Sequence, residues 1–130
     1  MSTQTPIVTG VDFVSIPITD YAAALEFYVD VLGLTPSTEY DRIPGAEFQV
    51  GNLTLQIIDA AAIGRSLTPH AFPIALQVQD MTSARAELAS RGVTFTHEFD
   101  SGVCHNAAFN DPDGNTFLLH QRYAPRAQDG

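Results

Sequence analysis

The stretch "FVSIPITDYAAALEFYVDVLGLT", residues 13–35, decides how the fold is interpreted, because its pattern returns later in the chain. It lines up with "PIALQVQDMTSARAELASRGVT", residues 73–94, at an offset of sixty residues. In each copy an apolar strand ends at an aspartate, an alanine-rich helix follows, and a glycine comes before the next strand. The sequence therefore predicts two copies of one structural unit.

Both copies carry signals for the start and end of a helix. Asp20 and Asp80 are short acceptors suited to the first free amides of a helix, and Gly33 and Gly92 suit the left-handed residue that ends one. Apolar residues recur at helical spacing: Tyr21, Leu25, Tyr28 and Leu32 in the first copy, and Met81, Ala84 and Leu88 in the second. Each helix thus has one apolar face to pack on a sheet.

Three strand candidates follow each helix. They lie at about 35–40, 46–50 and 53–58 in the first copy, and at 93–99, 103–110 and 115–122 in the second. Gly51 and Asn52 form a two-residue hairpin turn. We therefore expect an α+β fold of two βαβββ modules forming a curved mixed sheet around a cavity. Residues 1–130 make one domain: module 1 at about 11–59, a linker with one helical turn at about 60–72, module 2 at about 73–122, and a flexible tail at 124–130.

Composition narrows the classes of partner. The chain has 130 residues, 45% hydrophobic and 16% charged, which fits one globular domain. Its formal charge of -9 would repel a phosphate backbone, so nucleic acid and anionic membranes are not expected partners. Cys104 is the single cysteine, which excludes an intrachain disulfide and a thiolate zinc cluster.

The expected location is the cytoplasm. No apolar run approaches the roughly 18 to 20 residues that a membrane-spanning helix needs. The first residues, "MSTQTPIVTG", lack the basic start and apolar centre of a signal peptide.

Three motifs carry a resemblance to a known family. "ITDYAAALEFYVDVLGL" (18–34), "VQDMTSARAELASRGV" (78–93) and "FNDPDGN" (109–115) occur in that order on the duplicated frame. Together they resemble the vicinal oxygen chelate superfamily, which includes glyoxalase I, extradiol dioxygenases, fosfomycin-modifying enzymes and bleomycin-binding resistance proteins. The resemblance covers residues 11–122 and also implies a homodimer, with the modules paired either within one chain or between chains.

The resemblance places a metal at four positions, where this sequence has unsuitable side chains. Those positions fall on Phe13, Gln56, Pro73 and Leu118, of which only Gln56 could coordinate an ion. We therefore expect no metal cofactor. An alternative is a divalent metal held by relocated ligands drawn from four residues: Glu47, Gln56, His105 and His120.

Strand alternation indicates which side chains face the predicted cavity. Across the hairpin turn, Gln49 pairs with Thr54 and Glu47 with Gln56, on the face opposite the apolar row that the helix would cover. In the second module Leu118 and His120 share a face, and the resemblance puts Cys104, Asn106 and Ala108 opposite them, with His105 pointing away unless a bulge intervenes. The predicted ligand-binding residues are Phe13, Ser15, Gln49, Thr54, Gln56, Gln77, Cys104, Asn106 and Leu118, with Pro73 and Ala75 completing the wall.

Two residues are candidate acid-base groups. A neutral imidazole at His120 can donate or accept a proton near pH 7, and Glu47 in an apolar setting could act as a base. The alternatives are a hydrogen-bonded core histidine and a solvated carboxylate, and Cys104 fits a small buried apolar residue as well as a reactive thiol.

Three hypotheses for function follow. The first is a small-molecule-binding protein that sequesters a partly apolar organic ligand or transforms it without a metal. The second is a divalent-metal-dependent lyase or dioxygenase. The third is a non-catalytic partner or regulatory domain, which would have a sealed cavity and a large apolar patch outside it.

Overall fold

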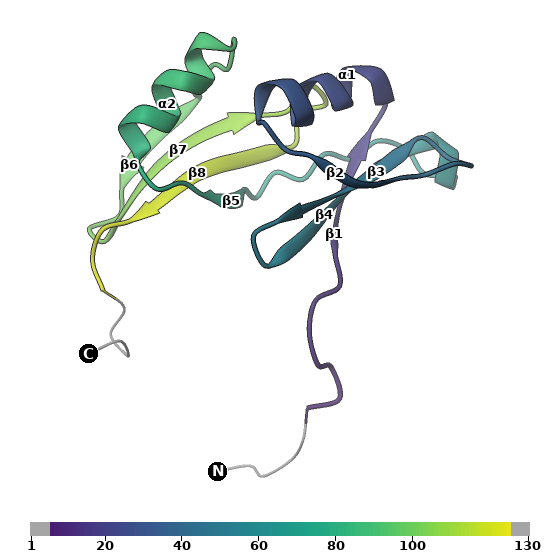
Figure 1. Cartoon of the computed structure of the whole chain (residues 1–130), viewed down its shortest axis with the longest axis horizontal. Coiled ribbons are helices and arrows are strands. Elements are labelled where there is room, and N and C mark those ends of the chain that lie inside the picture. Colours follow the sequence, from purple (N-terminus) through teal and green to yellow (C-terminus); the bar gives the residue numbers. More distant parts are fainter. Residues whose placement is uncertain (1–5, 126–130) are drawn as a thin grey trace.

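Two βαβββ modules lie side by side in the computed structural model, which describes residues 6–125 (Figure 1). Module 1 contains β1 (Val14–Ile18), α1 (Tyr21–Leu25) with its continuation η1 (Glu26–Val31), β2 (Pro36–Glu39), β3 (Gly45–Val50) and β4 (Leu53–Asp59). Module 2 contains β5 (Ile74–Gln77), α2 (Met81–Ser90), β6 (His97–Asp100), β7 (Cys104–Asn110) and β8 (Thr116–Arg122).

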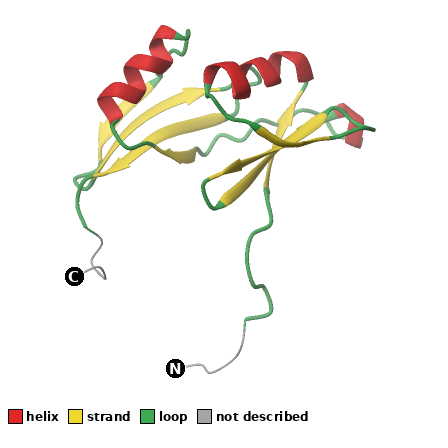
Figure 2. Ribbon diagram, viewed as in Figure 1, coloured by secondary structure: helices red, strands yellow, loops and turns green. Residues whose placement is uncertain are grey.

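Each module forms a four-stranded mixed sheet, in the orders β1-β4-β3-β2 and β5-β8-β7-β6. Both helices lie on the same side of the sheets (Figure 2). The predicted paired βαβββ fold is confirmed, and the two sheets are not closed into a barrel. The linker contains one short helical turn, η2 (Ala61–Ile63). Residues 126–130 of the predicted tail lie outside the described part of the chain. None of the helices in residues 6–125 is long and apolar enough to cross a membrane.

The first helix differs from the expected regular α-helix. Asp20 caps it as predicted, accepting a hydrogen bond from the Ala23 amide at 3.1 Å. Beyond Leu25, however, the helix continues as a π-helix, in which the Leu32 amide donates to the Phe27 carbonyl five residues earlier at 2.9 Å. Side-chain spacing does not reveal this widening, because the same apolar residues suit either kind of turn.

The predicted strand register is confirmed in both sheets. Glu47 lies opposite Gln56, and Gln49 lies opposite Thr54. The intervening Phe48, Leu55 and Ile57, together with Ile16, Ile18 and Ala46, are buried on the side that carries the helix. In module 2, β7 and β8 pair without a register shift over their whole length, so the bulge considered for residues 101–109 does not occur.

The turn at residues 110–115 joins the two modules through a buried carboxylate. Asp111, only 5% exposed, accepts hydrogen bonds from the Tyr28 hydroxyl at 2.6 Å and from the backbone amide and side chain of Asn115, each at 2.8 Å. The Asn115 side chain also donates to the Pro17 carbonyl of module 1 at 2.8 Å. Burial and the nearby carboxylates raise the pKa of Tyr28, so its hydroxyl remains protonated and donates. The "DPDGN" sequence therefore serves as a structural clamp between modules.

An aromatic cluster continues this junction into the core. The Tyr28 ring lies 5.8 Å from Phe48 of module 1 and 6.0 Å from Phe117 of module 2, measured between ring centroids. The Phe117 ring stacks in turn on Phe109 at 5.7 Å. Because Tyr28 and these phenylalanines are fully buried, one apolar core serves both sheets on their helix side. The opposite faces of the sheets stay free of this core.

Candidate functional site

Two sheet faces point away from the helices, and together they carry the predicted site residues. Residues directly opposite one another in neighbouring strands share a face. The first wall, in module 1, consists of Ser15, Tyr40, Glu47, Gln49, Thr54 and Gln56. The second wall, in module 2, consists of Ala75, Gln77, His97, Phe99, Cys104, Asn106, Ala108, Leu118 and His120.

A continuous chain of hydrogen bonds runs across the first wall. The Ser15 hydroxyl donates to the Gln56 carbonyl oxygen at 2.6 Å, and the Gln56 amide nitrogen donates to the Tyr40 oxygen at 2.8 Å. The Tyr40 hydroxyl in turn donates to the Glu47 carboxylate. The chain therefore ends in a carboxylate with a second oxygen, Oε1, that is able to accept from a ligand.

Tyr40 is a member of this chain that sequence reasoning missed. It lies just beyond β2, and alternation along the strand does not show that its ring folds back over β3. Burial and the hydrogen bond to Glu47 raise the pKa of Tyr40, while the hydrogen bond from Gln56 opposes the rise. The phenol therefore stays protonated at neutral pH and remains a donor.

Gly45 makes room for the Tyr40 ring. A methyl group at this position would lie 2.7 Å from Cδ2 of Tyr40 and 2.8 Å from the backbone oxygen of Ile57. Neither distance is tolerable for carbon, so only glycine allows the ring to lie against β3. This glycine is the sequence signal that could have pointed to Tyr40.

The four positions that hold a metal in related enzymes do not suit a divalent ion here. Phe13 and Leu118 are hydrocarbon, and Pro73 offers no side-chain donor. Gln56 has a carbonyl oxygen, but that oxygen already accepts from Ser15. Within residues 6–125, no group of three or more histidine, cysteine, aspartate or glutamate side chains is arranged to hold an ion. The donor set therefore does not fit a metal at this position.

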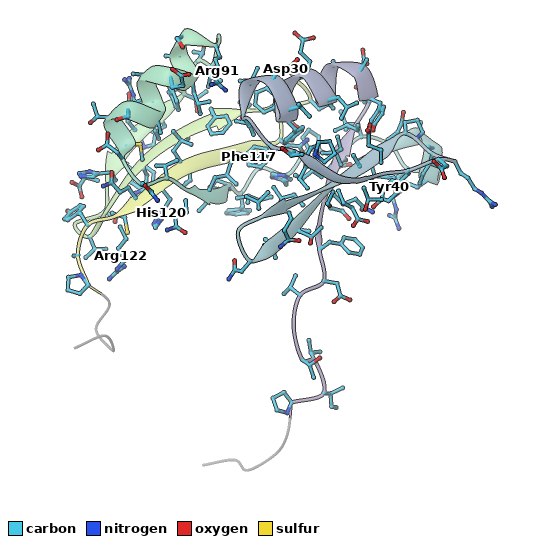
Figure 3. All side chains as sticks on the ribbon, viewed as in Figure 1. Asp30, Tyr40, Arg91, Phe117, His120 and Arg122 are labelled. Atoms are coloured by element: carbon cyan, nitrogen blue, oxygen red, sulfur yellow. The ribbon has the colours of Figure 1, made fainter. Side chains whose placement is uncertain are left out.

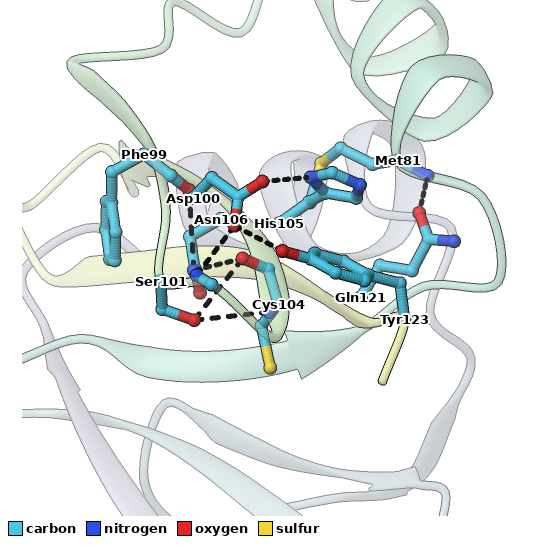
Figure 4. Close-up of polar contacts among 10 residues, drawn as sticks. Met81, Phe99, Asp100, Ser101, Cys104, His105, Asn106, Gln121 and Tyr123 are labelled. Atoms are coloured by element: carbon cyan, nitrogen blue, oxygen red, sulfur yellow. Dashed lines mark hydrogen bonds and ion pairs between the residues drawn. The ribbon is translucent and has the colours of Figure 1, made fainter. Parts of the chain in front are cut away.

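The relocated ligands considered from sequence are spread over different faces. Glu47 and Gln56 lie on the first wall and His120 on the second. His105 lies on the helix side of β7, where its Nδ1 is 3.6 Å from a carboxylate oxygen of Asp100 and its ring packs on Tyr123 (Figure 4). The Tyr123 hydroxyl donates a hydrogen bond to the other carboxylate oxygen of Asp100 at 2.8 Å.

The second wall is less hydrogen-bonded and more apolar than the first. Leu118 is 8% exposed and Cys104 is 5% exposed, and the Cys104 sulfur lies 3.9 Å from an Arg122 nitrogen at the rim. The Asn106 amide nitrogen donates to the Cys104 carbonyl at 3.3 Å and to the Phe99 carbonyl at 3.5 Å. His120 lies opposite Asn106 and is half-buried.

An aromatic pair on β6 also belongs to the second wall and was not predicted. His97 and Phe99 lie opposite Ala108 and Asn106, and their rings stack with centroids 5.3 Å apart. Phe99 is 43% exposed, so part of this ring is available to a ligand. Alternation along β6 could have found both residues, but the expected strand began at residue 93 and its facing was not assigned.

Much of both walls is open to solvent within a single chain, although Cys104, Asn106 and Leu118 are nearly buried. Ser15, Gln49 and Gln77 are exposed, and Phe13, just before β1, is 48% exposed. His120 and Tyr40 mark the two walls, which belong to separate sheets (Figure 3). In the part of the chain that the structure describes, no hydrogen bond joins Glu47 to His120. The predicted acid-base pair is thus divided between two modules.

Comparison with known proteins identifies the family. Paired βαβββ modules with open faces away from the helices define the architectural class. Residues 10–119 match the model of the Glyoxalase/Bleomycin resistance protein/Dioxygenase superfamily, and the chain belongs to this family. No curated protein sequence matches the chain.

Solved structures show the same fold over nearly the whole chain. A member of the same superfamily from Sphaerobacter thermophilus is 25% identical, with a TM-score of 0.76, covering 90% of this chain and 100% of that one. TnmS3, an antibiotic binding protein from Streptomyces sp. CB03234, is 22% identical, with a TM-score of 0.77 and coverage of 91% and 99%. A putative glyoxalase family protein from Bacillus anthracis is 17% identical, with a TM-score of 0.79 and coverage of 92% and 99%.

Proposed function

We propose that this protein binds a partly apolar organic molecule against its two walls without a metal ion, and that it sequesters this molecule. The observation that carries the proposal is the hydrogen-bond chain from Ser15 through Gln56 and Tyr40 to Glu47. Where related enzymes use a metal ligand, this chain uses a neutral amide whose donor and acceptor are both engaged. The similarity to an antibiotic binding protein agrees with a binding role.

The walls favour a ligand that is apolar over most of its surface and donates hydrogen bonds at one end. Phe99 offers exposed apolar surface on the second wall, where Leu118 is nearly buried, and the Glu47 carboxylate offers an acceptor on the first. Arg122 is the basic residue at the rim, and its guanidinium nitrogen Nη2 already donates to the Pro125 carbonyl at 3.0 Å. A hydroxyl or a protonated amine would therefore suit this site better than a carboxylate.

A closed site requires the two walls to face one another, and we propose that a homodimer achieves this. In one chain the two walls lie on separate sheets, and much of each wall is open to solvent. A second copy could place its module 2 over module 1 of the first, so that each site draws a wall from each chain. Ligand affinity would then depend on protein concentration.

Sequestration is preferred to turnover because Glu47 and His120 belong to different walls. Acid-base chemistry requires both groups within hydrogen-bond reach of one substrate. Metal-independent turnover through His120 and Glu47 thus depends on closure of the site, and an activity in the dimer that disappears in His120→Gln would favour it. A lyase or dioxygenase with relocated metal ligands finds no supporting cluster in the described residues.

The first test is metal content and response. Protein purified without added metal or chelator should contain no stoichiometric divalent ion, and manganese, nickel, zinc or iron should leave its melting temperature unchanged. A near-stoichiometric ion that Gln56→Ala removes would contradict the proposal.

The second test measures charge preference at the first wall. Tyramine and 4-hydroxyphenylacetate share a phenol ring and differ in charge, so isothermal titration should show tighter binding of tyramine. Glu47→Gln should abolish this preference, whereas Glu26→Gln, an identical change at an exposed helix position, should preserve it. Equal or tighter binding of the anion by the unmodified protein would contradict the proposed ligand class.

A further inference from the structure

A groove of about 360 Å³ lies between the two modules, on the helix side of the sheets. Its walls come from the end of the first helix, the tip of β3, the strands β5 and β8, and one face of α2. Most of the lining is aliphatic and includes Leu34, Val50, Leu76, Val78, Leu88 and Leu119. Leu76 on β5 and Val78 just after it point to the groove, whereas Ala75 and Gln77 alternate with them toward the second wall. Gln77 also borders the groove, so the two sites adjoin at this residue.

The charged groups at the rim of this groove neutralise one another. Arg91 Nη2 lies 2.8 Å from the Glu87 carboxylate, and Arg91 Nη1 donates to the Val31 carbonyl at 2.9 Å. The Arg91 side chain reaches from α2 toward the end of the first helix, near Asp30 (Figure 3). A charged ligand would have to break this pair to gain a partner of its own, so the rim favours neutral molecules.

The size and lining of the groove set the class of ligand. A cavity of roughly 150 Å³ lined by aliphatic and aromatic side chains is sufficient to bind benzene. The groove offers more than twice that volume, which suits a bicyclic or terpene-sized hydrocarbon. We propose that this groove is a second binding site, separate from the two walls, for a small neutral apolar molecule.

Residues of both modules line the groove. Leu34 and Val50 belong to module 1, whereas Leu76, Leu88 and Leu119 belong to module 2. A bound molecule would bury apolar surface of both modules and stabilise their present arrangement. Its effect on the protein should therefore be an increase in melting temperature, together with local changes at the groove.

The test uses naphthalene as a neutral probe and 2-naphthoate as its anionic counterpart. Methyl resonances of ¹³C-labelled leucine and valine should shift saturably with naphthalene, with a one-to-one end point, at Leu34, Leu76 and Leu119. Naphthoate should bind at least tenfold more weakly. Ala84→Met fills the groove from α2 and should weaken naphthalene binding at least tenfold, while Ala86→Met, the same change at an exposed position of that helix, should leave it unchanged.

Several results would overturn the proposal. These are the absence of saturable shifts, shifts confined to Leu118 and other residues of the walls, or equal affinity in the Ala84→Met and Ala86→Met variants. Groove resonances that change with protein concentration alone would show that a second copy covers this face. Glu47 does not line the groove. A failure of the tyramine test would therefore contradict the proposed function alone, and a failure of naphthalene binding would contradict the groove proposal alone.

Discussion

The two walls are built on the same βαβββ unit but differ in how their polar groups are used. On the first wall, Ser15, Gln56, Tyr40 and Glu47 are bonded to one another in a chain. On the second, apolar and aromatic side chains dominate, and the His120 ring has no hydrogen-bond partner among the described residues. The repeat therefore dictates the backbone frame, and each copy has acquired its own surface chemistry. One wall can anchor a polar group while the other covers an apolar one.

The contrast between the two walls requires that the modules are held together by a fixed junction. Asp111→Ala should weaken this junction. The substitution removes the acceptor of the buried Tyr28 hydroxyl and of two donors on Asn115. Each buried donor left without a partner costs about 1–3 kcal/mol, so we expect a loss of at least about 3 kcal/mol, measured by urea unfolding. Asp113→Ala, at a more exposed bond to Thr19, is the control and should cost less. Equal losses in the two variants would contradict the role of the buried clamp.

Gly45→Ala tests the packing that holds Tyr40 on the first wall. The added methyl group would clash with the Tyr40 ring and with the Ile57 carbonyl. Overpacking of this kind typically costs about 1–3 kcal/mol, and the ring should leave its position over β3. Urea unfolding measures the loss, and the NMR shifts of Gln56 and Glu47 report the ring. Gly51→Ala tests a different effect from Gly45→Ala. Its methyl group would meet open space, and any cost would come from the positive φ of 61° at Gly51. An unchanged Tyr40 environment would refute the packing argument.

Tyr40→Phe and His120→Phe sharpen the contrast between the walls. The first change removes a hydroxyl that accepts from Gln56 and donates to Glu47, and should cost about 1 kcal/mol of unfolding free energy. The second replaces an imidazole that makes no hydrogen bond within residues 6–125 by a phenyl ring, and should change stability by less than about 0.5 kcal/mol. Chemical denaturation at pH 7 compares the two. A larger loss for His120→Phe would mean that the second wall has the stronger polar network.

At high pH, tyrosines should ionise at a higher pH in the folded protein than in the unfolded chain. Burial, together with Glu39, raises the pKa of Tyr21 to about 12, and the pKa of Tyr40 is also raised. The folded protein therefore holds these protons more tightly than the unfolded chain, whose tyrosines ionise near pH 10. This small contribution to stability is present below pH 10 and is lost as pH rises toward 12. Absorbance at 295 nm should show late ionisation while the protein stays folded; complete ionisation near pH 10 would contradict it.

Local signals predicted the frame of this protein well. The caps at Asp20 and Asp80, the glycines at 33 and 92 and the hairpin register all follow from short-range chemistry, and the structure agrees. The predicted start of β6 at residue 93 was wrong: residues 93–95 have the composition of a strand, but pairing with β7 begins only at Thr96, whose amide donates to the Ala108 carbonyl at 2.8 Å. The π-helical segment was missed, because its apolar residues suit an α-helix equally well.

The candidate site was only partly predictable. Alternation placed Glu47 on the same face as Gln56, and Leu118 on the same face as His120, since side-chain direction along a strand is a local property. The family resemblance, rather than alternation, placed Asn106 opposite His120. Tyr40 was missed because it reaches the wall from a loop. Alternation also could not show that Gln56 is engaged at both ends of its amide, since its partners Ser15 and Tyr40 lie 41 and 16 residues away.

The sequence by itself determined the duplicated βαβββ frame, the helix ends, and the replacement of metal-ligand positions by Phe13, Pro73 and Leu118. Only the tertiary structure decided that "DPDGN" is a clamp, that the two walls are separate and open in one chain, and that an apolar groove lies between the modules. Propensity, capping and alternation act over a few residues and leave their record in the local sequence. The clamp, the walls and the groove depend on how two distant segments pack, and no local pattern encodes that arrangement.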